Sequence, residues 1–247
     1  SAGTPRLLRH EGNLYVTYTD RSEGEAEAWL QRIDGAYRPL GERLRLADAP
    51  GATLYARTVL GGDVVGTLYQ GLGSPYSTHF RAVDLEGNEV VASLDLDLPD
   101  SGAYSGGDIA FDGTHFLVAF KVVDAEAQKL LFARVDPATG DVTGPEVLTT
   151  SGHDDPDGQF LGFSPVSIEP SGGGAVVTFT RDRYSAPLDL SIPITQYVTV
   201  AEDGSVVEQG DLTNAAYHFH REARLSTVHG DIVAIFSTVD LLDPSPT

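Results

Sequence analysis

The sequence predicts an all-β fold, a five-bladed β-propeller of four-stranded antiparallel blades whose fifth blade is incomplete. Three features predict it: a short apolar strand that recurs, a glycine-containing turn before each copy, and an acidic turn after it. The apolar copies are residues 14–18, 64–69, 116–120, 175–179 and 232–236. A segment that recurs at such regular intervals along the chain is typical of architectures in which each repeated unit buries its apolar surface against its neighbours.

Each apolar strand follows a shorter extended segment and a tight turn. The turn contains Gly61-Gly62 in the second copy, Asp112-Gly113 in the third and His229-Gly230 in the fifth. Such residues tolerate the positive φ angles that two-residue hairpin turns require. The first two strands of each unit are therefore predicted to form a hairpin.

A third strand in each unit leads into an acidic turn, as at Asp34-Gly35 and at Asp136 before Gly140. Residues 89–94 and 141–143 then supply a fourth extended segment in two of the units. The strand 116–120 is apolar at every position, which indicates burial on both faces. Stacked propeller blades bury their middle strands in this way.

We predict one domain over residues 1–247, because no linker-like stretch divides the repeats. The predicted blades are residues 5–48, 52–99, 106–150, 162–213 and, in part, 221–247. The last segment is too short for four strands, so the strand near Ile232 is expected to present an unpaired edge. A continuation of the natural chain, strands from an adjacent subunit, or a loosely closed fifth blade would each account for it.

The composition excludes several classes of function. Asp and Glu number 36 against 16 Lys and Arg, a formal charge of −20 that repels nucleic acid. Cysteine is absent, which excludes disulfides and thiolate metal sites. No apolar run approaches the roughly 18 residues of a membrane span. Neither a G-x-S-x-G elbow nor a phosphate-binding loop is present, so the sequence offers no serine hydrolase or nucleotide-binding motif.

The third repeat carries a family resemblance. Residues 108–120 contain the turn Ala110-Phe111-Asp112-Gly113-Thr114 before the apolar strand, and Ala133-Arg134-Val135 precedes the acidic turn. This pattern resembles the repeats of secreted propeller proteins and lipoproteins of myxobacteria and related bacteria, with a close match over residues 108–140. The resemblance implies the fold and a secreted, periplasmic or cell-surface location. It transfers no catalytic residue, because such repeats are scaffold elements.

Glycan-cleaving propellers need carboxylates at the mouth of the central channel, where one donates a proton and the other acts as base or nucleophile. Asp108 and Glu222 are the acids near the starts of the predicted innermost strands. The corresponding stretches of the first, second and fourth blades offer Arg6, Tyr55 and Ser164 instead. Asp108 and Glu222 are therefore the weak catalytic candidates.

Two other segments concentrate polar side chains. Asp154, Asp155 and Asp157 have the oxygen density that calcium favours, although a solvated loop is the more ordinary interpretation. The second segment enters the fifth blade and is the predicted binding patch, since propellers place function in loops at the mouth. The patch comprises Tyr217, His218, His220, Arg221 and Glu222.

The sequence alone favours a secreted or cell-surface propeller without enzymatic activity, which binds proteins or assembles with itself through the incomplete blade. The alternative is a glycan-binding or glycan-cleaving propeller that uses the channel mouth. No cofactor is expected apart from a possible calcium ion, and neither nucleic acid nor a membrane span is expected.

Overall fold

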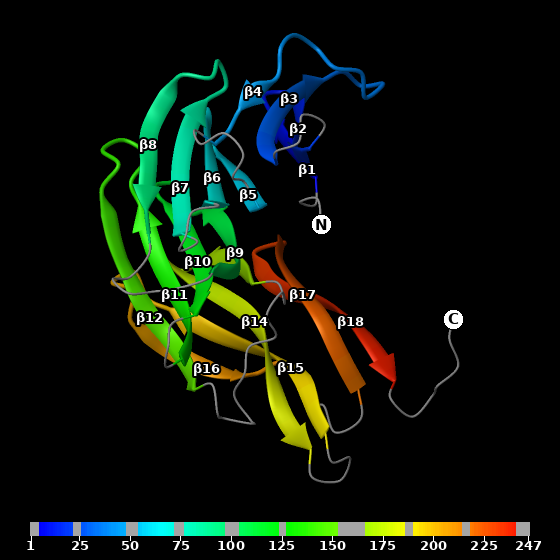
Figure 1. Cartoon of the computed structure of the whole chain (residues 1–247), viewed down its shortest axis with the longest axis vertical. Helices are drawn as coiled ribbons and strands as arrows, with labels where there is room; N and C mark the ends of the chain where they lie inside the picture. Colours follow the sequence, from blue (N-terminus) through cyan, green and yellow to red (C-terminus); the bar gives the residue numbers. More distant parts are fainter. Residues whose placement is uncertain are drawn as a thin grey trace. The chain divides into compact units, whose positions relative to one another are not determined.

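The computed structural model describes residues 5–21, 26–47, 54–71, 77–96, 104–123, 127–152, 166–185, 190–213 and 218–240. Within them the chain forms eighteen strands in five antiparallel sheets, and each sheet takes its strands consecutively from the chain (Figure 1). Four sheets have four strands and the fifth has two. No helix of the described residues is long and apolar enough to cross a membrane.

The strands follow the order of the predicted repeats, but three of them extend two or three residues beyond the predicted blade bounds, at Tyr104, Gly152 and His218. The first sheet contains β1 (Arg6–His10), β2 (Asn13–Asp20), β3 (Glu27–Ile33) and β4 (Leu44–Arg45). The second contains β5 (Leu54–Gly61), β6 (Val64–Gly71), β7 (Ser77–Asp84) and β8 (Glu89–Asp95). The third contains β9 (Tyr104–Phe111), β10 (Phe116–Val123), β11 (Ala127–Val135) and β12 (Val142–Gly152). The fourth contains β13 (Ser167–Ser171), β14 (Gly174–Ser185), β15 (Leu190–Val200) and β16 (Val206–Asp211). The fifth contains β17 (His218–Val228) and β18 (Asp231–Asp240).

The predicted hairpins are confirmed. His10 pairs with Asn13 across the first turn, and Gly61 pairs with Val64 across the second. Gly12 and Gly62 adopt φ angles of 80° and 63°, the left-handed region that such turns need. The acidic turns are also present, and Asp34 Oδ1 accepts hydrogen bonds from the amides two and four residues later. That pattern explains why the turn repeatedly begins with Asp.

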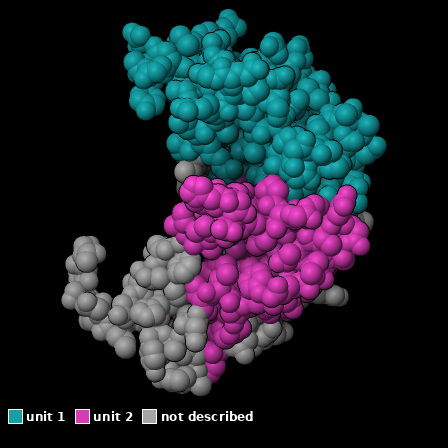
Figure 2. Space-filling model, turned by 180° about the vertical axis from the view of Figure 1, so that it is seen from behind, with its two compact units in different colours: residues 1–104, 109–118, 133–145 teal, residues 105–108, 119–132, 146–247 magenta. Residues whose placement is uncertain are grey.

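The chain divides into two compact units, coloured teal and magenta in Figure 2. One unit comprises residues 1–104, 109–118 and 133–145, and the other comprises residues 105–108, 119–132 and 146–247. The first two sheets belong to the first unit, the fourth and fifth to the second, and the third contributes residues to both.

In the first unit, the first and second sheets pack through apolar side chains and are also joined by a hydrogen bond between side chains. Tyr15 and Leu30 of the first sheet pack in one buried cluster with Val65 of the second. The hydroxyls of Thr17 and Thr58 lie 2.8 Å apart between the same two sheets. Apolar faces that meet in this way explain why the middle strands read as nearly continuous apolar runs.

Phe116 packs against the next interface of the same unit. Its ring lies 5.4 Å from that of Phe80 and 5.1 Å from that of Phe111, between centroids. A Cβ placed on Gly66 would lie 2.7 Å from the Phe116 ring, so glycine is needed for this close approach.

In the second unit, the fourth sheet contacts the fifth through β17, which lies against β13, β14 and β15. The amide of Leu225 in β17 donates a 3.0 Å hydrogen bond to Ser167 Oγ in β13. Burial falls sharply in the fifth sheet: β10 is buried from Phe116 to Val122, whereas Ile235 of β18 is 61% exposed. The fifth blade is thus incomplete, with two strands among the described residues, as the sequence predicts.

Candidate functional site

The two predicted carboxylates both occur on first strands. Asp108 lies in β9, the first strand of the third sheet, and only 4% of it is exposed. Glu222 lies in β17, the first strand of the fifth sheet, and its side chain is outside the described residues. The turn after β9 is ordered by Asp112, whose Oδ1 accepts hydrogen bonds from the amides of Thr114 and His115 at 2.8 and 2.7 Å.

The position of Asp108 can be compared between sheets. Asp112 closes the hairpin of the third sheet, because its amide donates a hydrogen bond to the carbonyl of His115. Asp108 lies four residues before Asp112. The same count in the other sheets gives Arg6, Arg57, Ser167 and Arg224. Among these five aligned positions, Asp108 is the one that carries an acidic side chain.

Two members of the set show what the position does. Arg6 Nη1 donates a 3.2 Å hydrogen bond to the carbonyl of Thr58 in β5, and Ser167 Oγ accepts from β17. In both cases the side chain contacts the first strand of the following sheet. The position therefore serves contacts between neighbouring blades, and in the third sheet it holds a buried carboxylate.

Lys121 is a buried ionisable group that sequence reasoning missed. It lies in β10, the strand next to β9, and is fully buried. Burial lowers the pKa of Lys121 from 10.5 to about 7, because the charged amine is poorly solvated there. Strongly perturbed groups concentrate at functional sites, and an amine with this pKa can exchange a proton near neutral pH. In the sequence it is a lysine between Phe120 and Val122 in a strand without other charges, a pattern that fits the polar end of a strand equally well.

The predicted binding patch falls largely outside the described residues. His218 and His220 lie in β17, opposite Asp240 and Thr238 of β18. The side chains of these histidines and of Arg221 are not described, and Tyr217 lies wholly outside the described residues.

The calcium candidates Asp154, Asp155 and Asp157 also lie outside the described residues. Across the described ranges, no group of three or more His, Asp or Glu side chains is arranged to hold a metal ion. The calcium site stays a prediction from the sequence.

No protein-family model and no curated protein sequence matches this chain. Solved structures do match. An α-L-arabinanase from Penicillium chrysogenum, in complex with arabinobiose, superposes with a TM-score of 0.62 at 9% identity, over 95% of this chain and 74% of the arabinanase. A thermostable family-43 glycoside hydrolase gives a TM-score of 0.54 at 9% identity, over 96% of this chain and 83% of the other.

A GH32 β-fructofuranosidase from Bombyx mori is also similar, with a TM-score of 0.55 at 12% identity over 95% of this chain. This chain spans about half of that enzyme's length, 54%. Together with the five consecutive sheets, these similarities show that the fold is a five-bladed β-propeller with an incomplete fifth blade, as predicted.

The same comparisons correct the hypothesis of function. The expected non-enzymatic scaffold, which binds proteins or assembles through the incomplete blade, is wrong, because the similar propellers are glycoside hydrolases. The expectation that the protein is not an enzyme is corrected by the same finding. Repeat pattern, net charge and an incomplete blade describe the scaffold, whereas the chemistry depends on a few side chains that vary between blades.

Proposed function

We propose that this propeller is a carbohydrate-active enzyme that cleaves glycosidic bonds with carboxylates carried on first strands of its blades. The observation that carries the proposal is the similarity to the arabinanase, at a TM-score of 0.62 over 95% of the chain. The buried carboxylate of Asp108, on the first strand of the third blade, supports it. A secreted or cell-surface location, which the third repeat implies by resemblance, would place the enzyme where polymeric glycans occur.

In this proposal Asp108 and Glu222 are the catalytic carboxylates. Glycoside hydrolysis needs one carboxylic acid that protonates the leaving oxygen and one carboxylate that activates water or attacks the sugar. Water completes the reaction by adding hydroxyl to the anomeric carbon while the leaving sugar departs as an alcohol. The anomeric configuration of the first product distinguishes inversion from retention.

Lys121 is proposed as a positioning residue rather than a catalytic one. Its amine lies in the strand adjacent to that of Asp108, and its charge changes near neutral pH because burial lowers its pKa to about 7. The charge on Lys121 would then shift the pH profile of the reaction. Lys121→Arg, which keeps the charge at all working pH values, and Lys121→Met, which has none at any pH, should both remove that inflection.

The proposal is tested by hydrolysis of polysaccharides. Arabinan, arabinoxylan, inulin and levan form the first panel, since arabinanase and fructofuranosidase are among the similar structures. Asp108→Asn and Glu222→Gln should each lower the rate by about 100-fold or more, the usual contribution of an acid or base catalyst. Asp141→Asn, in an exposed turn of the same blade, is the matched control and should keep the full rate.

Circular dichroism and thermal unfolding separate lost catalysis from lost folding. A protein inert toward the whole panel, or an Asp108→Asn variant as fast as the wild type, would overturn the proposal.

A further inference from the structure

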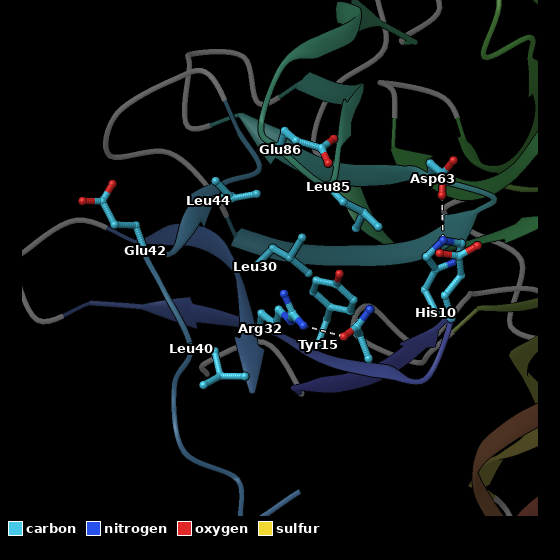
Figure 3. A pocket seen from close by; sticks show the side chains of 12 residues that line it. His10, Tyr15, Leu30, Arg32, Leu40, Glu42, Leu44, Asp63, Leu85 and Glu86 are labelled. Carbon is cyan, nitrogen blue, oxygen red and sulfur yellow. Dashed lines mark hydrogen bonds and ion pairs between the residues drawn. The ribbon is translucent and has the colours of Figure 1, made fainter. Parts of the chain in front are cut away.

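A cavity of about 500 Å³ lies between the first and second sheets, within the first compact unit (Figure 3). It is located at the ends of the strands where the hairpin turns occur. The turn of β1 and β2 contributes Glu11, the turn of β5 and β6 contributes Asp63, and the turn of β7 and β8 contributes Glu86. Its volume is within the range of pockets that hold small molecules, roughly 300 to 1,000 Å³.

The next interface of the same unit is packed with larger side chains. There the rings of Phe111 and Phe116 pack against the second sheet, and the backbone of Gly61 approaches Phe111. Counted from the hairpin turns, the second sheet has Leu60 and Val65 where the third sheet has these two phenylalanines. The smaller side chains fill less volume between the first and second sheets.

Most of the cavity's lining is polar, and its apolar part is confined to the floor and to leucine side chains. Tyr15 and Leu30 are buried and form its floor, and Leu44 and Leu85 line it from the two facing sheets. A Cβ on Gly87 would lie 3.0 Å from Leu44, so the turn of the second sheet closes tightly over the first beside the cavity. The floor therefore offers a surface for the C–H groups of a ligand.

The rim is polar and carries mixed charge. Arg32 Nη2 donates a 2.6 Å hydrogen bond to Asn13 Oδ1, which holds the guanidinium over the cavity. His10 Nε2 lies 2.6 Å from Asp63 Oδ1, an ion pair when the ring is protonated but not an aligned hydrogen bond. Glu42 and Glu86 add exposed carboxylates. The rim thus holds several hydrogen-bond acceptors and, in Arg32, a rigid set of donors.

We propose that this cavity binds a neutral saccharide unit, as an accessory site separate from the catalytic carboxylates. The inference rests on the proposed function, because it assumes that the protein acts on glycans. A sugar ring has an apolar C–H face and a polar edge of hydroxyls, which matches the apolar floor and the mixed rim. Carboxylates outnumber the single arginine at the rim, so phosphorylated or uronic-acid ligands are repelled.

Isothermal titration calorimetry tests this assignment. The probes are arabino-, xylo- and fructo-oligosaccharides, with an oligogalacturonide of the same length as the charged comparison. At least one neutral probe should bind the wild type, and the oligogalacturonide should bind at least tenfold more weakly. Arg32→Gln should weaken neutral binding about tenfold, because a hydrogen bond to a charged group is lost.

The matched control is Arg38→Gln, which removes an exposed arginine paired with Asp34 and outside the cavity. It should bind the neutral probe as the wild type does. Glu42→Gln is a second variant and should weaken binding, since a carboxylate accepts hydroxyl hydrogen bonds more strongly than an amide does.

Hydrolysis of a chromogenic monosaccharide glycoside, measured in parallel, separates the two proposals. If the protein hydrolyses the glycoside but Arg32→Gln and Glu42→Gln leave its affinity for the neutral oligosaccharide unchanged, the accessory site is overturned. The enzyme proposal then remains intact. Neutral binding that these variants weaken, in a protein without hydrolysis, supports the site and counts against the enzyme. The accessory site is also overturned if no neutral oligosaccharide binds, or if the oligogalacturonide binds as tightly as the neutral oligosaccharide does.

Discussion

Burial of Lys121 makes the stability of the protein depend on pH above neutrality. The pKa of Lys121 falls from 10.5 to about 7 on folding, because burial in β10 disfavours the charged amine. Between these values the unfolded chain binds a proton that the folded chain has lost, so the free energy of unfolding rises with pH. The slope reaches about 1.4 kcal/mol per pH unit, and the full cost of the buried charge is on the order of 5 kcal/mol.

The variant Lys121→Met replaces the amine with an apolar side chain of similar length. From pH 7 to pH 9, Lys121 alone should add about 2 to 3 kcal/mol to the unfolding free energy of the wild type, and this increment should vanish in the variant. Urea unfolding at each pH measures it. Lys129→Met, at a partly exposed position in β11, is the matched control and should retain the wild-type slope.

A direct measurement is also available, because Lys121 and Lys129 are the two lysines of the chain. Selective carbon-13 labelling of lysine gives two ε-carbon signals, and one should titrate near pH 7. Parallel stability curves for the wild type and Lys121→Met, or the absence of any signal that titrates near pH 7, would refute the argument.

Two further predictions concern packing. Gly66→Ala places a methyl group against the buried Phe116 ring, 2.7 Å from its nearest atom, and should lower the free energy of unfolding by about 1 to 3 kcal/mol in urea titrations. Gly152→Ala, where a Cβ meets nothing within 4 Å, is its control, and equal costs would contradict the close approach. Arg43→Gln removes a guanidinium that lies 3.9 Å from the Trp29 ring centroid and is also paired with Asp20 at 2.6 Å, and should lower the free energy of unfolding. It should also shift the emission of Trp29, the single tryptophan, and an unchanged spectrum would argue against stacking in solution.

The blade units were predictable because their signals are local. Two-residue turns at Gly12 and Gly62 need positive φ, and the acidic turn at Asp34 needs a side-chain acceptor for its amides. Middle strands buried on both faces, such as β10, need apolar residues at successive positions. Each requirement acts within a few residues, so it leaves a readable pattern in the chain.

The cavity and the buried amine were not predictable for the opposite reason. The cavity beside Tyr15 is lined by Leu44 of its own sheet and by Leu85 of another sheet, and no turn or periodicity in the sequence indicates that these residues meet. Lys121 follows an apolar run and reads as the polar end of a strand, but the sheets around it bury it completely. Both features arise from contacts between blades, which the sequence specifies only through the final packing.

The hairpin-aligned position of Asp108 shows why a repeat obscures function. Arg6 and Ser167 satisfy the same structural need there, a contact to the first strand of the next blade, with opposite hydrogen-bonding roles. Because the scaffold accepts a donor or an acceptor at this position, packing does not require a carboxylate in the third blade. The nearly buried acid of the third sheet therefore differs in chemistry from the arginines and the serine at the same position of the other sheets. That asymmetry, rather than the repeat itself, is the physical reason to test Asp108 first.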